Sequence, residues 1–141
     1  MEYIDLGLPS GNLFAVEDLQ KYYTFEEAKE KFGNSLPTLN EVKELLRYTW
    51  KNWIPRKKGL DFLGLNGNRL FLPAGGKVYQ DRLDSKGHWG VYLIDITKYK
   101  HWKCYETAIL SFFPNHEIRI TGHTVNKEDP WKGTVILIKR K

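Results

Sequence analysis

Cysteine is almost absent from the sequence, since Cys104 is the single one in 141 residues. One cysteine permits no intrachain disulfide and no metal site with two thiolate ligands, which fits a reducing compartment. Long apolar runs are also missing: the longest, residues 135–138, is far shorter than the ~20 residues that span a bilayer. Residues 1–5 lack the basic region and apolar stretch of a signal peptide. We therefore expect no membrane span, and a protein that is cytoplasmic or phage-associated as the chain stands, or secreted if a leader has been removed.

The composition is that of a folded chain rather than a disordered one. Apolar residues make up 41% of the sequence and aromatic residues 14%, whereas disordered chains are poor in aromatic and β-branched residues. The length suits one sizeable core, and neither an internal repeat nor a linker-like change of composition divides the chain. We predict a single domain over residues 1–141.

The chain carries a modest excess of positive charge, +5 from 22 Lys and Arg against 17 Asp and Glu. The excess is gathered in residues 56–58, in Lys98, Lys100 and Lys103, and in residues 139–141. Nucleic-acid-binding proteins usually gather basic residues and stacking aromatics on one face. Because the three short clusters lie in separate segments, we interpret them as ordinary solvated surface lysines. The alternative interpretation is a basic nucleic-acid-binding accessory protein.

Two capping boxes predict two short amphipathic helices in the first third of the chain. Thr24 and Glu27 form the first box, and Thr38 and Glu41 form the second. In such a box the hydroxyl accepts from a first-turn amide while the carboxylate returns to the cap amide. Apolar residues then recur at helical spacing. The predicted helices cover residues 24–32 and 39–48.

The rest of the chain has the pattern of strands and turns. Residues 66–68, Asn-Gly-Asn, predict a hairpin turn because Asn and Gly tolerate positive φ. The near-continuous apolar run 134–139 is typical of a central strand covered on both faces. Helices followed by strands indicate an α+β fold. Further strands are predicted at residues 61–65, 69–72, 88–96, 106–113 and 117–121.

A specific motif lies at the N-terminus. Residues 3–15 read Tyr-Ile-Asp-Leu-Gly-Leu-Pro-Ser-Gly-Asn-Leu-Phe-Ala. This segment resembles the opening signature of the Fibrobacter succinogenes major paralogous domain, a family abundant in Bacteroidetes. That signature consists of an aromatic residue, Val, Asp, Leu-Gly-Leu-Pro-Ser-Gly and then Leu-Trp-Ala. Ile4 replaces the Val and Phe14 replaces the Trp, while the core of the motif, residues 6–11, is intact.

Later segments resemble the same family in the same order. Residues 36–38, Leu-Pro-Thr, are similar to the family's Arg-Met-Pro-Thr helix start, and residues 48–50 match the threonine and tryptophan after that helix. Residues 64–76 resemble its Gly-Pro-Asn-Gly-Asn-Ser-Ile-Phe-Leu-Pro-Ala-Ala-Gly segment. The C-terminal half departs from the family: residues 88–92 lack the serines of its Tyr-Trp-Ser-Ser strand, and residues 134–138 lack the Arg-Pro of its last strand.

The resemblance implies a C-type-lectin-like fold, which formylglycine-generating enzymes share. In that fold two short helices flank small antiparallel sheets, the N- and C-terminal strands pair, and irregular C-terminal loops carry the ligand surface. Residues 6–11 are then a strand-turn-strand segment with Ser10 in the turn, where Ser and Gly are favoured for backbone reasons.

No catalytic pattern emerges from the sequence. Ser10 is not part of a Gly-x-Ser-x-Gly nucleophile elbow. Formylglycine-generating enzymes use a pair of cysteines, which Cys104 alone does not supply. Activation of Cys104 by His101 is disfavoured because, on an extended segment, a spacing of three puts the two side chains on opposite faces. We expect a non-catalytic protein, and an enzyme whose site assembles from separated loops is an alternative.

Metal-binding motifs are absent as well. The four histidines, at positions 88, 101, 116 and 123, show neither His-x-x-x-His nor His-Glu-x-x-His spacing. Calcium prefers several carboxylate and carbonyl oxygens together, and the Glu-Pro-Asn and Trp-Asn-Asp motifs of sugar-binding lectins are missing. We expect neither a metal nor another cofactor.

Two aromatic and polar loops remain as the candidate ligand surface. Tyr and Trp supply a large contact area at low entropy cost and keep a polar group. Trp50, Trp53 and Trp89 are expected in the core. We predict a metal-independent binding module that recognises a protein or a glycan through residues 97–105 and 122–132; for Trp102 and Trp131, capping of the core is the alternative. The candidate ligand-binding residues are Tyr99, His101, Trp102 and Tyr105 in the first loop and His123, Asn126, Asp129 and Trp131 in the second.

Overall fold

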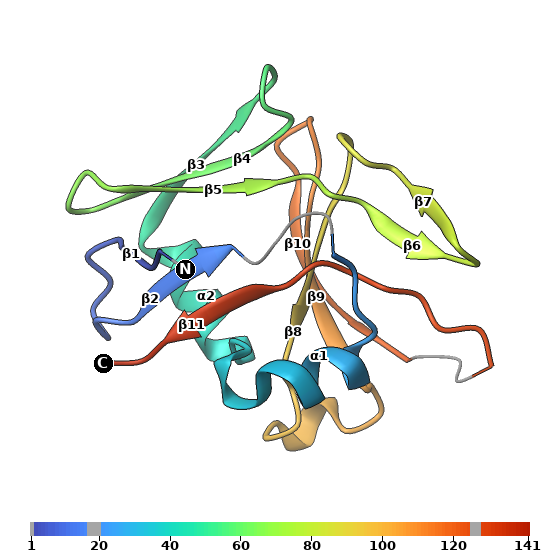
Figure 1. The fold of residues 1–141 in the computed structure, drawn as a ribbon. Helices are drawn as coiled ribbons and strands as arrows, with labels where there is room; N and C mark the ends of the chain where they lie inside the picture. Colours follow the sequence, from blue (N-terminus) through green and yellow to red (C-terminus); the bar gives the residue numbers. More distant parts are fainter. Residues whose placement is uncertain (1, 17–20, 125–127) are drawn as a thin grey trace.

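The protein has an α+β architecture with two short helices and several small antiparallel sheets (Figure 1), as the sequence predicts at this level. The computed structural model describes residues 2–16, 21–124 and 128–141. Asn126, one of the predicted ligand residues, lies outside the described residues. The helical elements are α1 (Phe25–Phe32), α2 (Leu39–Arg47) and the 3₁₀ helices η1 (Gly33–Ser35) and η2 (Lys100–Trp102).

Capping boxes start both α-helices, which confirms the sequence prediction. At α1 the Thr24 hydroxyl accepts from the Glu27 N–H at 3.1 Å, and the Glu27 carboxylate accepts from the Thr24 N–H at 2.9 Å. At α2 the Glu41 carboxylate accepts from the Thr38 N–H at 2.9 Å. Each box satisfies amides that have no partner within the helix, and this is why the helices begin where the sequence indicates.

The N- and C-terminal strands share one sheet, in the order β1-β2-β11. β1 (Ile4–Asp5) and β11 (Ile136–Lys139) both pair antiparallel with β2 (Leu13–Val16). The segment 6–12 between β1 and β2 contains the predicted turn. The sheet thus joins the two ends of the described chain through β2.

A second sheet has the order β3-β4-β5. β4 (Gly59–Gly64) and β5 (Arg69–Pro73) form the predicted hairpin, and Gly67 in its turn has a φ of +85°. β3 (Thr49–Ile54), which pairs antiparallel with β4, was not among the predicted strands. The reason is local: Lys51 interrupts the apolar pattern, although its ammonium is half-buried and donates to the Thr49 carbonyl at 2.8 Å.

The third sheet has the order β10-β9-β8, and a separate hairpin stands beside it. The sheet strands β8 (Gly90–Ile94), β9 (Thr107–Phe112) and β10 (Ile118–His123) lie within the ranges predicted from the sequence or within two residues of them. The hairpin of β6 (Lys77–Tyr79) and β7 (Arg82–Asp84) was not predicted, and it projects at the right of Figure 1.

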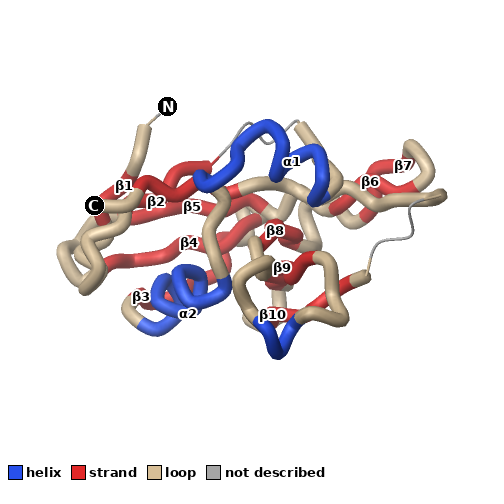
Figure 2. The backbone as a smooth tube through the Cα atoms, turned by 90° about the horizontal axis from the view of Figure 1, so that it is seen from below, coloured by secondary structure: helices blue, strands red, loops and turns tan. Residues whose placement is uncertain are grey.

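The β8-β9-β10 sheet divides the core into two clusters. Side chains alternate along β8, so that Tyr92 and Ile94 belong to a larger cluster while Val91 and Leu93 belong to a smaller one. The larger cluster contains the apolar side of α2, and the smaller one contains Ala28 of α1. The two helices are therefore set against different parts of the core. Figure 2 shows them well apart in the molecule.

The last strand differs from the prediction in its position. β11 lies at the edge of its sheet and not in the centre. It is nevertheless buried on both sides, because Ile136 and Ile138 pack in the larger cluster and Leu137 in the smaller one. Just before β11, the Thr134 N–H donates to the Val91 carbonyl at 2.9 Å. The two faces of the apolar run are thus covered by side chains of the two clusters, although a strand pairs with only one of its edges.

Trp50 is exposed, whereas the sequence suggested that it belongs to the core. Its exposed fraction is 62%, against 8% for Trp53. The two residues lie three positions apart on β3, and side chains three positions apart on a strand point to opposite faces. Trp89 is half-buried and packs against the smaller cluster.

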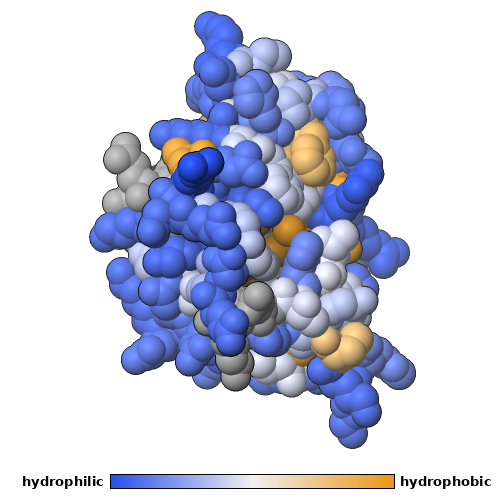
Figure 3. Space-filling view, turned by 90° about the vertical axis from the view of Figure 1, so that its right-hand side faces the viewer, coloured by the Kyte–Doolittle hydropathy of each residue, from blue (hydrophilic) through white to orange (hydrophobic). Residues whose placement is uncertain are grey.

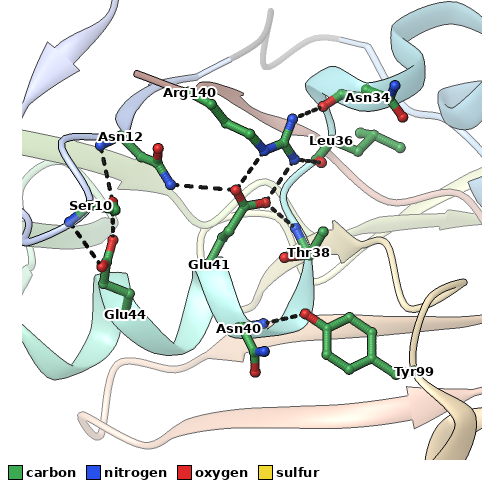
Figure 4. A network of polar contacts seen from close by, with 10 residues as sticks. All are labelled: Ser10, Asn12, Asn34, Leu36, Thr38, Asn40, Glu41, Glu44, Tyr99 and Arg140. Carbon is green, nitrogen blue, oxygen red and sulfur yellow. Dashed lines mark hydrogen bonds and ion pairs between the residues drawn. The ribbon is translucent and has the colours of Figure 1, made fainter.

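A polar network ties α2 to the N-terminal turn and to the C-terminus (Figure 4). Glu44 accepts from the Ser10 hydroxyl at 2.5 Å and from the Ser10 N–H at 3.2 Å. The Ser10 hydroxyl also accepts from the Asn12 N–H at 3.1 Å. Glu41 accepts from the Arg140 guanidinium at 2.7 and 2.8 Å. Ser10 therefore connects a turn to a helix.

Replacing Ser10 by alanine is expected to lower the free energy of unfolding by about 1–2 kcal/mol, because Glu44 loses a charge-assisted hydrogen bond. Urea denaturation followed by far-UV circular dichroism measures this loss. Ser35→Ala, in η1, is the matched control. A loss within the ~0.5 kcal/mol of ordinary surface substitutions would contradict the structural role of Ser10.

Candidate functional site

The β6-β7 hairpin is joined by backbone hydrogen bonds to the segment that precedes β11. Gln80 and Asp81 connect the two strands with φ values of +52° and +59°, as in a type I′ turn. Val78 and Lys132 exchange two N–H···O bonds of 2.9 and 2.8 Å. These bonds fix Trp131, the neighbour of Lys132, beside the hairpin.

Aromatic and basic side chains gather at this junction. We name them the aromatic patch: Lys77, Tyr79, Trp89, His123 and Trp131. The Lys77 ammonium lies 4.9 Å from the ring centre of Trp89 and 6.0 Å from that of Tyr79. The rings of His123 and Trp131 meet edge to face with their centres 5.7 Å apart. The patch thus combines ring faces with a cation and an imidazole.

A small crevice opens within the aromatic patch. It measures about 40 Å³ and is lined by Lys77, Trp89, His123 and Trp131 together with two core side chains. That volume holds a few water molecules at most, whereas sites that enclose small molecules measure roughly 300–1,000 Å³. The crevice can therefore take a protruding group of a ligand but not a whole ligand.

The indole nitrogen of Trp89 is buried and has no hydrogen-bond partner among the described residues. Stacking on Phe113, with ring centres 6.0 Å apart and planes 13° apart, fixes the orientation of the indole. A buried donor without an acceptor costs about 1–3 kcal/mol, and native proteins contain few of them. An acceptor group in this part of the patch would remove that cost.

The surroundings of His123 favour its neutral form. Burial lowers the pKa of His123, and the positive charge of Lys77 lowers it further. The Thr121 hydroxyl lies 2.8 Å from Nε2 of the ring. A neutral imidazole has one donor and one acceptor nitrogen, so His123 adds polar groups of both kinds to the patch without adding charge.

A carboxylate borders the patch at Tyr79. Asp129 accepts from the Tyr79 hydroxyl at 2.8 Å and from the Gln80 amide at 2.9 Å. The hydrogen bond to Asp129, with its negative charge, raises the pKa of Tyr79. The phenol is therefore held in its protonated form, and the Asp129 carboxylate borders the patch as an acceptor.

The surface around the β6-β7 hairpin is mainly hydrophilic. Figure 3 shows this side of the molecule, where hydrophobic side chains appear as separate spots rather than as one continuous area. Large continuous apolar areas mark surfaces that bury themselves against another protein. The aromatic patch instead presents rings interspersed with polar groups.

The first predicted loop, residues 97–105, lies elsewhere and supports the fold. The Tyr99 hydroxyl accepts from the Asn40 N–H at 3.0 Å, at the start of α2. Tyr99 and Trp102 are half-buried against the larger core cluster. His101 is exposed, and Tyr105, whose exposed fraction is 42%, lies beside Trp102 with ring centres 5.8 Å apart.

The two predicted loops contact opposite faces of the β8-β9-β10 sheet. The Tyr105 ring packs over Gly122 on one face, where its Cδ2 lies 2.5 Å from the position of an added Cβ. His123, the next residue of β10, meets Trp131 on the other face. The structure therefore brings His123, Asp129 and Trp131 to one junction and separates them from the first loop. Trp131 is half-buried against the smaller cluster and keeps part of its surface in solvent.

The described residues contain no cluster of metal-ligating side chains. Within residues 2–16, 21–124 and 128–141, no group of three or more His, Cys, Asp or Glu side chains could hold a metal ion. Cys104 and His101 are both exposed, and no hydrogen bond in the described part of the chain joins them. Their segment is a 3₁₀ helix followed by a turn, so the expectation of an extended segment was wrong.

Of the three basic clusters, residues 56–58 lie apart from the other two, whereas Lys98 and Arg140 of those two line the same hollow beside α2. In Figure 1 the β3-β4 turn with residues 56–58 is at the top, η2 with its neighbouring lysines is at the bottom, and the C-terminus is at the left. They do not form the continuous stripe that is typical of nucleic-acid-binding surfaces.

Comparison with known proteins identifies no relative: no protein-family model, no curated protein and no solved structure matches the chain. None of the helices in the described ranges is both long and apolar enough to cross a membrane.

Three residues of the aromatic patch were missed by the sequence analysis: Lys77, Tyr79 and Trp89. A weak signal exists for the first two, because residues 77–79 and 82–84 flank a polar two-residue link, as the strands of a hairpin do. No local pattern places Trp89 beside Trp131, since the contact depends on the pairing of distant segments.

Proposed function

We propose that the protein is a non-catalytic, metal-independent binding module whose ligand surface is the aromatic patch. The observation that carries this proposal is the crevice lined by Trp89, Trp131, His123 and Lys77, together with the buried Trp89 N–H, which has no acceptor among the described residues. Patches of this composition bind through ring faces while a few placed polar groups fix the orientation of the ligand.

A glycan is the ligand class that the patch fits best. Tyr79, with an exposed fraction of 41%, and the half-buried Trp131 offer ring faces against which the C–H face of a sugar ring can pack. His123 and Asp129 offer donors and acceptors for hydroxyl groups, and a ligand acceptor that reached the buried Trp89 N–H would pair it. A shallow crevice and the lack of a continuous apolar area on this side favour a glycan over a protein partner.

We propose further that the chain belongs to the Fibrobacter succinogenes major paralogous domain family and has a C-type-lectin-like fold. Two of the family-like segments contact each other here, which supports a common architecture: the Asn66 and Asn68 amides donate to the Asp5 carbonyl at 2.8 and 2.9 Å. The last strand, β11, pairs with β2 and not with β1, so the sheet agrees with the expected pairing of terminal strands only in that it contains both ends of the described chain. An experimental structure that fails to superpose on lectin-like domains would refute it.

The glycan proposal is tested with a glycan array followed by calorimetric titration of the best hit. Trp131→Ala is expected to weaken binding at least tenfold, which corresponds to about 1.4 kcal/mol. Trp89→Phe keeps a stacked ring and removes the N–H, so it is expected to weaken binding by a similar factor with little loss of stability.

Two controls give this test its specificity. Trp50→Ala removes an exposed tryptophan on β3, and Trp102→Ala removes the half-buried tryptophan of the first predicted loop. Both are expected to leave affinity unchanged. A glycan whose binding is lost in Trp50→Ala or Trp102→Ala and kept in Trp131→Ala would place the site elsewhere, and a protein ligand displaced by Trp131→Ala would correct the ligand class.

A further inference from the structure

Three lysines from two distant segments line one cavity. Lys57 and Lys58 belong to the β3-β4 turn, and Lys86 belongs to the loop between β7 and β8. The cavity measures about 420 Å³, within the range of roughly 300–1,000 Å³ that is usual for sites of small molecules. Its lining residues are Lys57, Lys58, Pro73, Ala74, Gly75, Lys86 and Gly87.

The charge of this cavity is uncompensated. No carboxylate is among its lining residues, and none of Lys57, Lys58 and Lys86 forms an ion pair with another described residue. Three lysines on one cavity raise the local positive potential, although the Lys57 ammonium also lies 5.4 Å from the ring centre of Phe71. A bound anion would offset this potential.

Backbone hydrogen bonds hold the two lysine segments against the same corner of the chain. The Ala74 N–H donates to the Lys58 carbonyl at 2.9 Å, and the Gly87 N–H donates to the Ala74 carbonyl at 2.7 Å. A Cβ at position 87 would lie 3.0 Å from Cδ of Lys58, so glycine leaves room for the lysine stem. The approach of Lys58 to the Lys86 loop is thus part of the fold.

Lys58 has an unfavourable backbone conformation. Its φ is +53°, in the left-handed region that glycine and asparagine adopt with less strain than lysine does. Strain of this kind is concentrated at functional positions, where the function of a particular side chain outweighs the loss of stability that its backbone conformation causes. The next residue is Gly59. The positive φ thus falls on the lysine and not on the adjacent glycine, which would adopt it with less strain.

We propose that the cavity lined by Lys57, Lys58 and Lys86 binds a small molecule that carries a diphosphate or a phosphate monoester. Lysine ammonium groups bind phosphate oxygens as point charges, and two or more negative charges on one small group match three lysines. The site is distinct from the aromatic patch and does not depend on the glycan proposal.

The test is calorimetric titration with inorganic pyrophosphate, at low and at physiological ionic strength. Lys58→Gly is expected to weaken binding at least fivefold and to raise the melting temperature, because glycine relieves the strained φ. Lys86→Gln is expected to weaken binding by a similar factor. The rise in melting temperature shows that loss of binding in Lys58→Gly does not reflect a damaged fold.

Two controls decide between a site and general charge. Lys98→Gln removes the same charge from an exposed lysine beside α2, and it is expected to leave pyrophosphate affinity unchanged. The proposal is overturned if Lys98→Gln weakens binding as much as Lys86→Gln does, or if Lys58→Gly retains full affinity. Tighter binding of a short DNA duplex, reduced equally by all three substitutions, would overturn it in favour of a nucleic-acid surface.

Discussion

The replacement of Gly64 by alanine is expected to lower the free energy of unfolding by about 3 kcal/mol, at the upper end of the usual cost of overpacking. A Cβ at position 64 would lie 2.3 Å from the Leu6 carbonyl oxygen and 2.8 Å from the Leu6 Cα. Both are backbone atoms, so no side-chain rotation relieves the contact. Leu6 itself is fully buried, and moving it away would open the larger core cluster.

Gly67→Ala is the matched control for this substitution. Gly67 lies in the same hairpin, and nothing lies within 4 Å of an added Cβ, but its φ is +85°. Alanine there is expected to cost only the about 1 kcal/mol of a left-handed residue. Urea denaturation and the melting temperature measure both effects, and equal losses at positions 64 and 67 would show that the contact with Leu6 is unimportant.

Replacement of Glu41 by alanine is expected to cost about 3 kcal/mol, because one carboxylate serves three partners (Figure 4). It completes the capping box with Thr38, pairs with Arg140 and accepts from the Asn12 amide at 3.4 Å. Loss of a helix cap costs about 1 kcal/mol, and loss of the charge-assisted bonds to Arg140 adds about 2 kcal/mol, although the guanidinium keeps the Asn34 and Leu36 carbonyls. Denaturation at pH 7 measures the loss, and a value no larger than that of Lys43→Ala on the exposed side of α2 would refute the prediction.

Glu41→Gln separates the two contributions. Glutamine keeps the capping box but not the charge, so the expected loss is about 1–1.5 kcal/mol. Burial raises the pKa of Glu41, but hydrogen bonds from Arg140 and Thr38 outweigh it and lower the pKa overall. The ionised carboxylate therefore stabilises the fold above the ordinary pKa of about 4.3, and this stabilisation is lost as the pH falls through the lowered value. The difference between the wild type and Glu41→Gln should accordingly shrink between pH 7 and pH 3.

Features that a few neighbouring residues determine could be predicted from the sequence. The capping boxes at Thr24 and Thr38 give helix starts because the hydrogen bonds involved span only three residues. The Asn-Gly-Asn turn at residues 66–68 gives the β4-β5 hairpin because its geometry requires positive φ. Together these elements specify the α+β class.

Features set by distant partners could not be predicted in the same way. The β6-β7 turn is built from Gln80 and Asp81, which take positive φ without the Asn-Gly signal that usually marks such a turn. Lys51 breaks the apolar pattern of β3 and is accommodated only because the Leu46 and Thr49 carbonyls accept from it. Trp50 is exposed because β3 turns that face to solvent, which only the pairing with β4 decides.

The candidate site was predicted in part for the same reason. His123, Asp129 and Trp131 were identified as aromatic and polar loop residues, and the structure places them at one junction. Their partners Tyr79 and Trp89 come from segments far away in the sequence, which the Val78–Lys132 bridge and the sheet bring into place. The use of residues 97–105 as a ligand surface stays a prediction. Two of their aromatic rings, those of Tyr99 and Trp102, already contact the core, and the Tyr99 hydroxyl also contacts α2.

The sheet of β1, β2 and β11 also determines how the domain can be presented. Ile4 and Ile138 both lie opposite Phe14, so they are separated by two strand spacings, about 10 Å. The β6-β7 hairpin projects on the far side of the molecule from the C-terminus (Figure 1). The domain could thus be fused to a carrier protein at either end, or inserted into a surface loop of one. In each case the carrier would lie next to the β1-β2-β11 sheet, and the aromatic patch would stay exposed on the opposite side.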